Sequence, residues 1–191
     1  AANWREYEHR MKGPYEAANP GSPVSIYAIP GNHDWYDGLT AFLRLFAQEE
    51  PVGGWRTAQH RSYFALRLPH RWWLFAVDVQ LDSYVDEPQL KYFLAAAEEL
   101  GPGDRVILVQ ARPAWVMTDE YPEAYDSIDY VIRHVLEPTG ARIPLLLAGD
   151  YHHYSRYSGP GPDGNGRTLI TCGGGGAYLT STEHLPSEVA V

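Results

Sequence analysis

The sequence contains little cysteine, little positive charge and no long apolar run. Cys172 is the one cysteine among 191 residues, so no disulfide can form within the chain, which fits a reducing compartment. No apolar run reaches the length of a membrane-spanning helix, and the first residues lack the pattern of a signal peptide. These absences predict a cytoplasmic protein with no membrane segment in this chain.

Basic residues are scarce relative to acidic ones. There are 15 Lys and Arg residues against 24 Asp and Glu residues, and the formal net charge is −9. Because proteins bind long nucleic acids by neutralising phosphates with Lys and Arg, this balance argues against nucleic acid as a partner. A small phosphoester is not excluded, since a bound metal ion can reverse the local field in an acidic protein.

Apolar spacing and turn residues predict alternating helices and strands. The start of the chain has helical spacing and is expected to break at Gly13-Pro14 and at Asn19-Pro20-Gly21. Further helices are expected over residues 39–47, 89–100 and 124–136. Strands are expected over residues 24–29, 105–109 and 143–147, and hairpins over 62–77 and 154–171. The pattern predicts an α/β fold with two packed, mixed sheets flanked by helices, in a single domain over residues 1–191.

The first group of chemically active side chains is Pro30-Gly31-Asn32-His33-Asp34, directly after the apolar segment 24–29. Ligands of α/β proteins gather at the carboxyl ends of strands. Asn32 offers a neutral oxygen ligand for a hard cation, His33 can donate a proton, and Asp34 can orient an imidazole or lie behind a metal ligand. The alternative is a polar turn in which Asn32 and Asp34 cap the next helix.

The second group is Gly149-Asp150-Tyr151-His152-His153, which follows the apolar segment 143–147. In an extended segment, Asp150 and His152 would point to the same side. Two ligands at this spacing suit a metal site. The alternative is a surface loop with two ordinary histidines. His153 could replace His152 as a ligand.

Together the two segments resemble the calcineurin-like metallophosphoesterase superfamily. That family carries, in order, Asp-x-His, Gly-Asp, Gly-Asn-His-Asp/Glu, a His, and Gly-His-x-His. Residues 31–34 match the third motif completely, and residues 149–152 resemble the last motif with Asp150 in place of its first His. The resemblance extends from about Val24 to His184, and is strongest to a bacterial subgroup in which Trp-Tyr-Asp-Gly-Leu follows the third motif.

The resemblance implies a fold, an activity and a set of site residues. The fold would be the αββα sandwich of the family, and the activity would be hydrolysis of a small phosphoester with two divalent metal ions (Mn, Fe, Zn or Mg) that activate water. Asn32, Asp150 and His152 would be metal ligands. His33 would protonate the leaving oxygen or stabilise the transition state, and Asp34 would support that geometry. Some relatives in the subgroup are attached to membranes.

Two departures from the family pattern matter. The Asp-x-His and Gly-Asp motifs are not found before Gly31, so we expect this chain to be a C-terminal portion of the domain, lacking its first strands and inactive by itself. Ala111 stands where the family has a metal-binding His, two residues before Pro113. An oxygen of Asp150 would then replace a nitrogen ligand and favour Mn or Mg over Zn. These departures also fit a catalytically silent binding or regulatory module, or a plain scaffold without metal.

Four further features have a structural and a functional interpretation. Trp35 and Tyr36 are expected to pack and hold their loop rather than stack on a ligand. The run Gly173–Gly176 is expected to allow a tight chain path beside the second motif rather than to bind phosphate. Arg112 can contact phosphate or form a surface ion pair. Cys172 is expected to be a small buried side chain.

Overall fold

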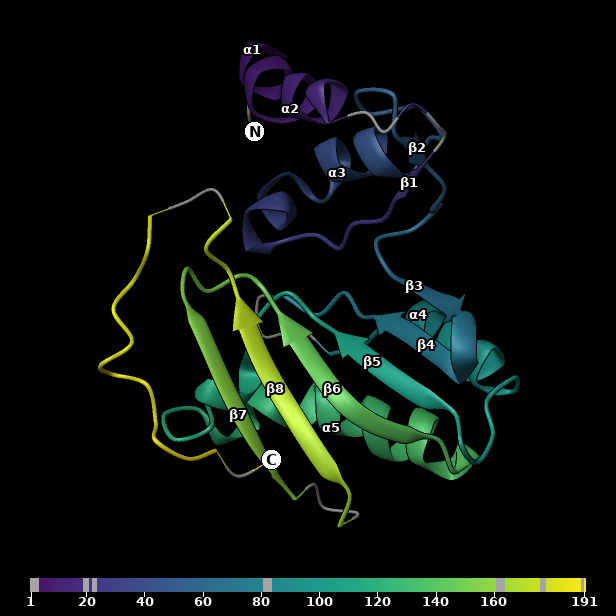
Figure 1. Cartoon of the computed structure of the whole chain (residues 1–191), viewed down its shortest axis with the longest axis vertical. Helices are drawn as coiled ribbons and strands as arrows, with labels where there is room; N and C mark the ends of the chain where they lie inside the picture. Colours follow the sequence, from purple (N-terminus) through teal and green to yellow (C-terminus); the bar gives the residue numbers. More distant parts are fainter. Residues whose placement is uncertain are drawn as a thin grey trace. The chain divides into compact units, whose positions relative to one another are not determined.

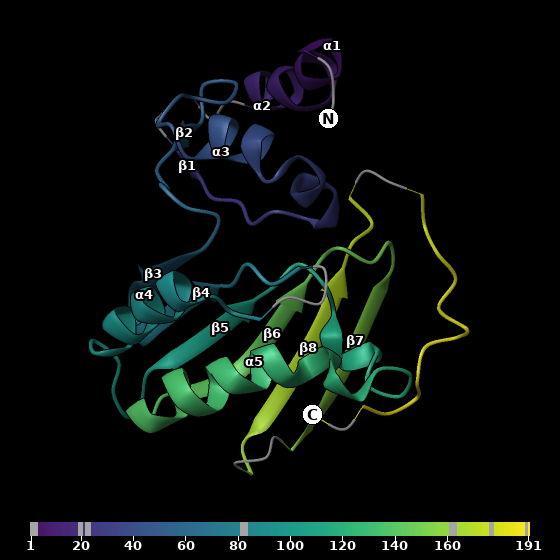
Figure 2. The ribbon, with the colours of Figure 1, turned by 180° about the vertical axis from the view of Figure 1, so that it is seen from behind.

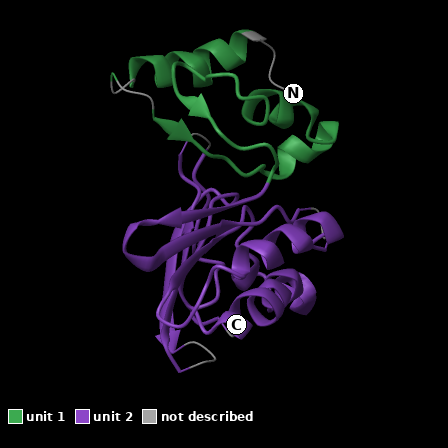
Figure 3. Cartoon of the chain, turned by 90° about the vertical axis from the view of Figure 1, so that its right-hand side faces the viewer, with its two compact units in different colours: residues 1–62 green, residues 63–191 purple. Residues whose placement is uncertain are grey.

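The computed structural model describes residues 4–18, 21, 24–80, 84–160, 164–175, 178–189 and 191. The chain is an α/β protein with one sheet of two strands and one of six strands. It forms two compact units, residues 1–62 (unit 1) and residues 63–191 (unit 2), shown in Figure 3. That the two units act as one domain stays a prediction.

Unit 1 begins with a helical segment made of α1 (Trp4–Tyr7), the π-helical turn η1 (Glu8–Lys12) and α2 (Gly13–Ala17). The prediction that Gly13-Pro14 breaks this helix is wrong. The backbone N–H of Gly13 donates to the carbonyl of Glu8, five residues earlier. Proline lacks an N–H, and in an α-helix its ring clashes with the carbonyl four residues earlier. The wider π turn before Pro14 avoids this clash, so the helix continues. The other expected break, at Asn19-Pro20-Gly21, includes residues outside the described ranges.

The rest of unit 1 consists of short elements around a small core. These are β1 (Ser25–Ile26), the 3₁₀ helix η2 (Asn32–Asp37), α3 (Thr40–Phe46) and β2 (Arg56–Thr57). β1 and β2 pair in parallel. The strand expected over residues 24–29 is shorter than predicted, because β1 spans two residues. α3 confirms the predicted helix. It buries Phe42 and Phe46 together with Leu39, and Trp35 packs against this cluster.

Unit 2 is built on the six-stranded sheet (Figure 1). In spatial order its strands are β3 (Phe64–Leu68), β4 (Trp72–Ala76), β5 (Arg105–Val109), β6 (Arg142–Ala148), β8 (Gly166–Cys172) and β7 (Tyr154–Pro160). The four central strands are parallel, and β3 and β7 are antiparallel edge strands of hairpins. Both predicted hairpins and both predicted central strands are confirmed.

Two helical segments cover one face of this sheet (Figure 2). They are α4 (Glu87–Ala97), and α5 (Asp126–Val131) with its π-helical continuation η6 (Ile132–Leu136). α4 connects β4 to β5 and α5 connects β5 to β6, so two successive crossovers of the same hand place both helices on the same side. Phe75, Leu108 and Leu146 are fully buried beneath them. No helix among the described residues is long and apolar enough to cross a membrane.

The opposite face of the sheet is also apolar. Leu74, Ile107 and Leu145 lie opposite one another in neighbouring strands, as do Val109 and Leu147. These residues alternate with the buried ones, and each keeps part of its surface accessible. Sheets made of parallel strands are normally covered on both faces. This face therefore has the composition of a packing surface.

Cys172 does not have the environment expected from the sequence. The prediction that it is buried is wrong, because its side chain is exposed. Cys172 is the last residue of β8, where it pairs with exposed Tyr154 of the edge strand β7. A residue at the end of a strand next to the sheet edge has few neighbours to cover it.

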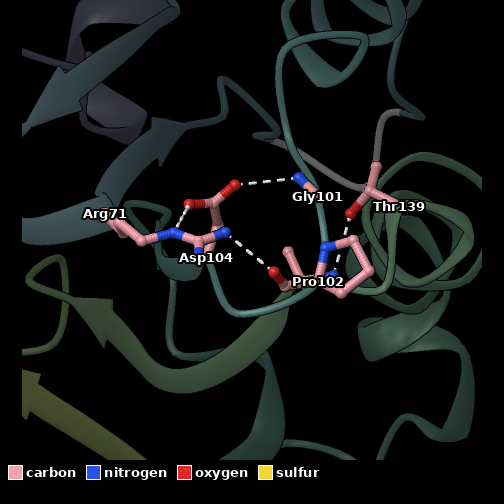
Figure 4. A network of polar contacts seen from close by, with 6 residues as sticks. Arg71, Gly101, Pro102, Asp104 and Thr139 are labelled. Atoms are coloured by element: carbon pink, nitrogen blue, oxygen red, sulfur yellow. Dashed lines mark hydrogen bonds and ion pairs between the residues drawn. The ribbon is translucent and has the colours of Figure 1, made fainter.

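A polar network joins the amino-terminal ends of β4 and β5 (Figure 4). Oδ1 of Asp104 accepts a hydrogen bond of 2.9 Å from Nε of Arg71, and Oδ2 accepts one of 2.8 Å from the backbone N–H of Gly101. Nη2 of Arg71 also donates to the carbonyl of Pro102 at 2.7 Å. The hydrogen bond from Arg71, followed by that from Gly101, lowers the pKa of Asp104 below its ordinary value.

Candidate functional site

The first motif forms a closed turn at the start of η2. The backbone N–H of Gly31 donates to Oδ2 of Asp34 at 2.9 Å, and the N–H of Asp34 donates back to the carbonyl of Gly31 at 3.1 Å. Oδ2 of Asp37 accepts from the N–H of Ala41 at 3.1 Å and caps α3. The contact of Asp34 is the one expected from the capping interpretation. It also holds Asn32 and His33 on a defined turn, as the predicted supporting role of Asp34 requires.

The aromatic residues beside this motif behave differently from each other. Trp35 packs against the core of unit 1, as predicted. The same prediction is wrong for Tyr36, which is 69% exposed. The ring of Tyr36 lies 4.9 Å from the ring of His33, which is also exposed. His33 is therefore accessible to a ligand, and its ring contacts a surface tyrosine.

The second motif is bound to the loop that follows β5. The backbone N–H groups of Gly149 and Asp150 both donate to the carbonyl of Ala111, at 3.0 and 2.8 Å. β5 and β6 are parallel neighbours, so the segments after them leave the same edge of the sheet. The structure thus places Asp150 beside the position where the family has its metal-binding His. That the carboxylate of Asp150 is a metal ligand stays a prediction.

The glycine run after β8 closes against the same loop. The backbone N–H of Gly173 donates to the carbonyl of His153 at 3.0 Å. A Cβ atom at Gly173 would lie 1.9 Å from the carbonyl oxygen of Tyr151 and 2.4 Å from that of Gly149. Real Cβ atoms do not approach backbone oxygens so closely. The predicted tight chain path beside the second motif is confirmed at Gly173.

The two histidines of this motif differ in accessibility. His153 is 3% exposed, and its Nε2 lies 3.3 Å from Oγ of Ser155. Burial, with a smaller effect of nearby His184, lowers the pKa of His153. His152 is half-buried, with its ring 4.7 Å from the ring of Tyr178. The more accessible imidazole is the one that the family resemblance assigns to the metal.

The predicted metal ligands are divided between the two units. Asn32 belongs to unit 1, and Asp150 and His152 belong to unit 2. Their convergence on one pair of cations stays a prediction. Within the described ranges, no three His, Cys, Asp or Glu side chains gather as a complete metal site. Carboxylate, amide and imidazole donors are nevertheless the types that suit Mn²⁺, so the donor set fits such an ion in part.

A cavity that we did not predict from the sequence lies within unit 2. Its volume is about 610 Å³, and its walls come from the segments after β4, β5 and β6 and from the start of α5. Six of the lining residues are Tyr84, Gln110, Arg112, Met117, Ile128 and Tyr151. One signal was present in the sequence: Gln110 continues the buried alternation of Val106 and Leu108 with a polar side chain. Arg112 lines this cavity, and its Nε donates to Sδ of Met117 at 3.0 Å.

No protein-family model, no curated protein and no solved structure matches this chain. The functional assignment therefore depends on the motifs and on the local geometry around them.

Proposed function

We propose that this chain is part of a metal-dependent phosphoester hydrolase of the calcineurin-like metallophosphoesterase superfamily. The observation that carries the proposal is the pair of hydrogen bonds from Gly149 and Asp150 to the carbonyl of Ala111. These hydrogen bonds hold the backbone of Asp150 next to Ala111, the position at which the family has a metal-binding His. The chain thus combines a complete Gly-Asn-His-Asp turn at residues 31–34 with a potential metal ligand, Asp150, in place of the first His of the last motif. We take this combination as support for a metal site rather than for two unrelated surface loops.

Each residue has a role that its chemistry allows. When bound, the two divalent ions would supply an activated water and would neutralise phosphoryl charge. Asn32 and Asp150 would hold one ion, and His152 would contribute to the other. His33, which is exposed at the start of η2, would donate a proton to the leaving oxygen. Asp34 would hold that turn through its hydrogen bond to Gly31.

The apolar face of the six-stranded sheet supports the finer fold proposal, a two-sheet αββα sandwich. Helices cover one face, and the partly accessible side chains of Leu74, Ile107 and Leu145 form the other. In a sandwich, a second sheet packs on such a face about 10 Å away. We propose that this face packs against a second sheet in the full-length protein.

The activity is tested on the full-length protein with 4-nitrophenyl phosphate and bis(4-nitrophenyl) phosphate, in the presence of Mn²⁺, Mg²⁺ or Zn²⁺. We expect turnover that a chelator removes and Mn²⁺ restores. His33→Ala should lower kcat by about 100-fold or more, the usual effect of losing a general acid, and should leave the bound metal unchanged. His70→Ala, at an exposed turn, is the matched control. Unchanged turnover in His33→Ala would refute the role of His33.

Metal content tests the ligand assignment separately from turnover. Asp150→Ala should lower the metal bound per chain from about two ions to about one, because one of the two sites loses an anionic ligand. Ala111→His should shift the preference from Mn²⁺ towards Zn²⁺, since it restores a nitrogen donor. Elemental analysis after dialysis measures both. Equal metal content in Asp150→Ala and the unmodified protein would exclude Asp150 as a ligand.

A second candidate function is a silent module that binds metal or ligand without hydrolysis. The observation that favours it is buried Ala111 in place of a metal-binding His. This function predicts metal uptake by the full-length protein without turnover of either phosphoester. Chelator-sensitive turnover would exclude it.

A further inference from the structure

Gln110 is a polar side chain buried at the end of an apolar strand. It is 4% exposed, and it follows Val106 and Leu108 on the face of β5 that packs under the helices. Among the residues that the structure describes, none accepts a hydrogen bond from its Nε2. Buried amide groups in folded proteins nearly always have a partner, because leaving one unpaired is costly. We therefore expect Nε2 of Gln110 to donate a hydrogen bond to an acceptor outside the described residues.

The cavity of about 610 Å³ offers room for that acceptor, because Gln110 is one of its lining residues. Sites for small organic molecules typically measure about 300–1,000 Å³ and combine an apolar lining with a few polar groups. Here Val79 and Met117 provide apolar surface, and Tyr84 provides an exposed aromatic ring. Arg112 brings positive charge to the wall. The cavity thus has the size and the mixed lining of a ligand site.

The cavity and the candidate metal site involve different residues of the same two loops. Gln110 and Arg112 line the cavity, whereas Ala111 between them is not among the described residues that line it. Similarly, Tyr151 lines it, whereas its neighbours Asp150 and His152 do not. A molecule in the cavity would contact the loops that carry Asp150 and His152.

The polar groups of the cavity define the chemistry of its ligand. Nε of Arg112 and the hydroxyl of Tyr151 both donate to Sδ of Met117, each at 3.0 Å. A thioether is a weak acceptor, and an anionic oxygen would replace it favourably for both donors. Glu123, the acidic residue among the described residues of the lining, is exposed to solvent. The favoured ligand has negative oxygens and a body that suits an apolar and aromatic wall.

We propose that this cavity binds a small organic anion with an aromatic body. An oxygen of the anion accepts a hydrogen bond from Nε2 of Gln110, and the guanidinium of Arg112 pairs with its charge. The aromatic body packs against Val79 and Met117. Binding here is a second function of the protein beside the proposed hydrolysis.

Isothermal titration calorimetry with 2-naphthoate tests the proposal. A chelator is present throughout, so the result does not depend on metal binding or hydrolysis. We expect 2-naphthoate to bind at least about tenfold more tightly than 2-naphthalenemethanol, a neutral compound of similar shape, because one charge-assisted hydrogen bond changes affinity by about that factor. Arg112→Gln should abolish this preference. Gln110→Leu, which has similar shape but no donor, should weaken 2-naphthoate binding by about tenfold.

Further variants locate the binding in the cavity. Arg133→Gln removes an exposed arginine that pairs with Asp129 on α5, and should leave binding unchanged. Ala124→Phe fills the cavity and should abolish binding of both compounds. If Gln110→Leu does not fold, Gln110→Met, which has a similar length, no charge and no donor, should weaken 2-naphthoate binding by about tenfold. The proposal is overturned if 2-naphthoate does not bind at about 10 mM, or if its affinity is the same in the Arg112 and Gln110 variants.

Discussion

At the scale of the residue, Gly173 shows how a single missing side chain shapes the candidate site. Its Cα lies against the backbone oxygens of Gly149 and Tyr151, on the loop that carries Asp150. Any other residue would push that loop away. A glycine within a glycine-rich run can therefore be required for packing even where no phosphate is bound.

Gly173→Ala should lower the free energy of unfolding by about 1–3 kcal/mol, the usual cost of overpacking, because the clash is with backbone atoms that cannot rotate away. Thermal unfolding measures this change. Gly175→Ala is the matched control, since a Cβ at Gly175 meets no atom within 4 Å. If both variants unfold at the same temperature, the close approach at Gly173 is not a constraint on the fold.

Asp104 is a second residue whose surroundings make a prediction. Because its folded-state pKa is lowered by Arg71 and Gly101, its ionised form stabilises the fold. That contribution is fully present above the ordinary pKa of 3.8 and is lost as the pH falls through the lower, folded-state pKa. We expect Asp104→Asn to lower the unfolding temperature by a few degrees at neutral pH. Below pH 3.8, the unfolding temperature of the variant should fall less with decreasing pH than that of the unmodified protein.

Thermal unfolding from neutral pH to below the ordinary pKa of Asp104 measures both effects. Asp119→Asn, at an exposed position, serves as the control and should reproduce the acid behaviour of the unmodified protein. If the unfolding temperature of Asp104→Asn falls with decreasing pH as steeply as that of the unmodified protein, Asp104 does not contribute to acid sensitivity.

At the scale of the element, α4 shows why local signals predict a helix well. Pro88 lies in its first turn, and Oδ1 of Asp86 accepts a hydrogen bond of 2.8 Å from the backbone N–H of Gln89. The side chain of Gln89 then exchanges two hydrogen bonds with the backbone of Asp78, after β4. The start of α4 is thus tied to the segment that forms one wall of the cavity.

Asp86→Ala should lower the free energy of unfolding by about 1 kcal/mol, because the N–H of Gln89 loses its cap. For a chain of this size, that corresponds to about 2–4 °C in the unfolding temperature. Asp86→Ser retains a capping oxygen and should be close to the unmodified protein. Equal effects of Ala and Ser would mean that the cap does not contribute to stability.

At the scale of the whole molecule, the six-stranded sheet predicts a covered face. If a second sheet packs on the side of Leu74, Ile107 and Leu145, then Ile107→Lys should lower the free energy of unfolding of the full-length protein by about 2 kcal/mol or more, because it buries a charge without a partner. Leu94→Lys, on the 43% exposed Leu94 of α4, should change stability little. Similar small effects of both substitutions would contradict the sandwich proposal.

The sequence by itself determined the local elements and the chemical groups of the candidate site. The apolar run 105–109, the hairpin turn at Pro69–Arg71 and the helix signals around Pro88 all depend on neighbours along the chain, and the structure confirms each of these elements. The predicted helix break at Gly13-Pro14 failed because a π turn precedes Pro14 and avoids the clash of its ring with the helix backbone.

Only the tertiary structure decided which distant residues meet. The contact between Ala111 and Asp150 exists because β5 and β6 are adjacent in the sheet, and no pattern within either segment states that order. The burial of His153, the exposure of Cys172 and the cavity at Gln110 likewise depend on which elements pack around each side chain. Periodicity in a sequence reports one face of one element, whereas burial and convergence are properties of several elements together.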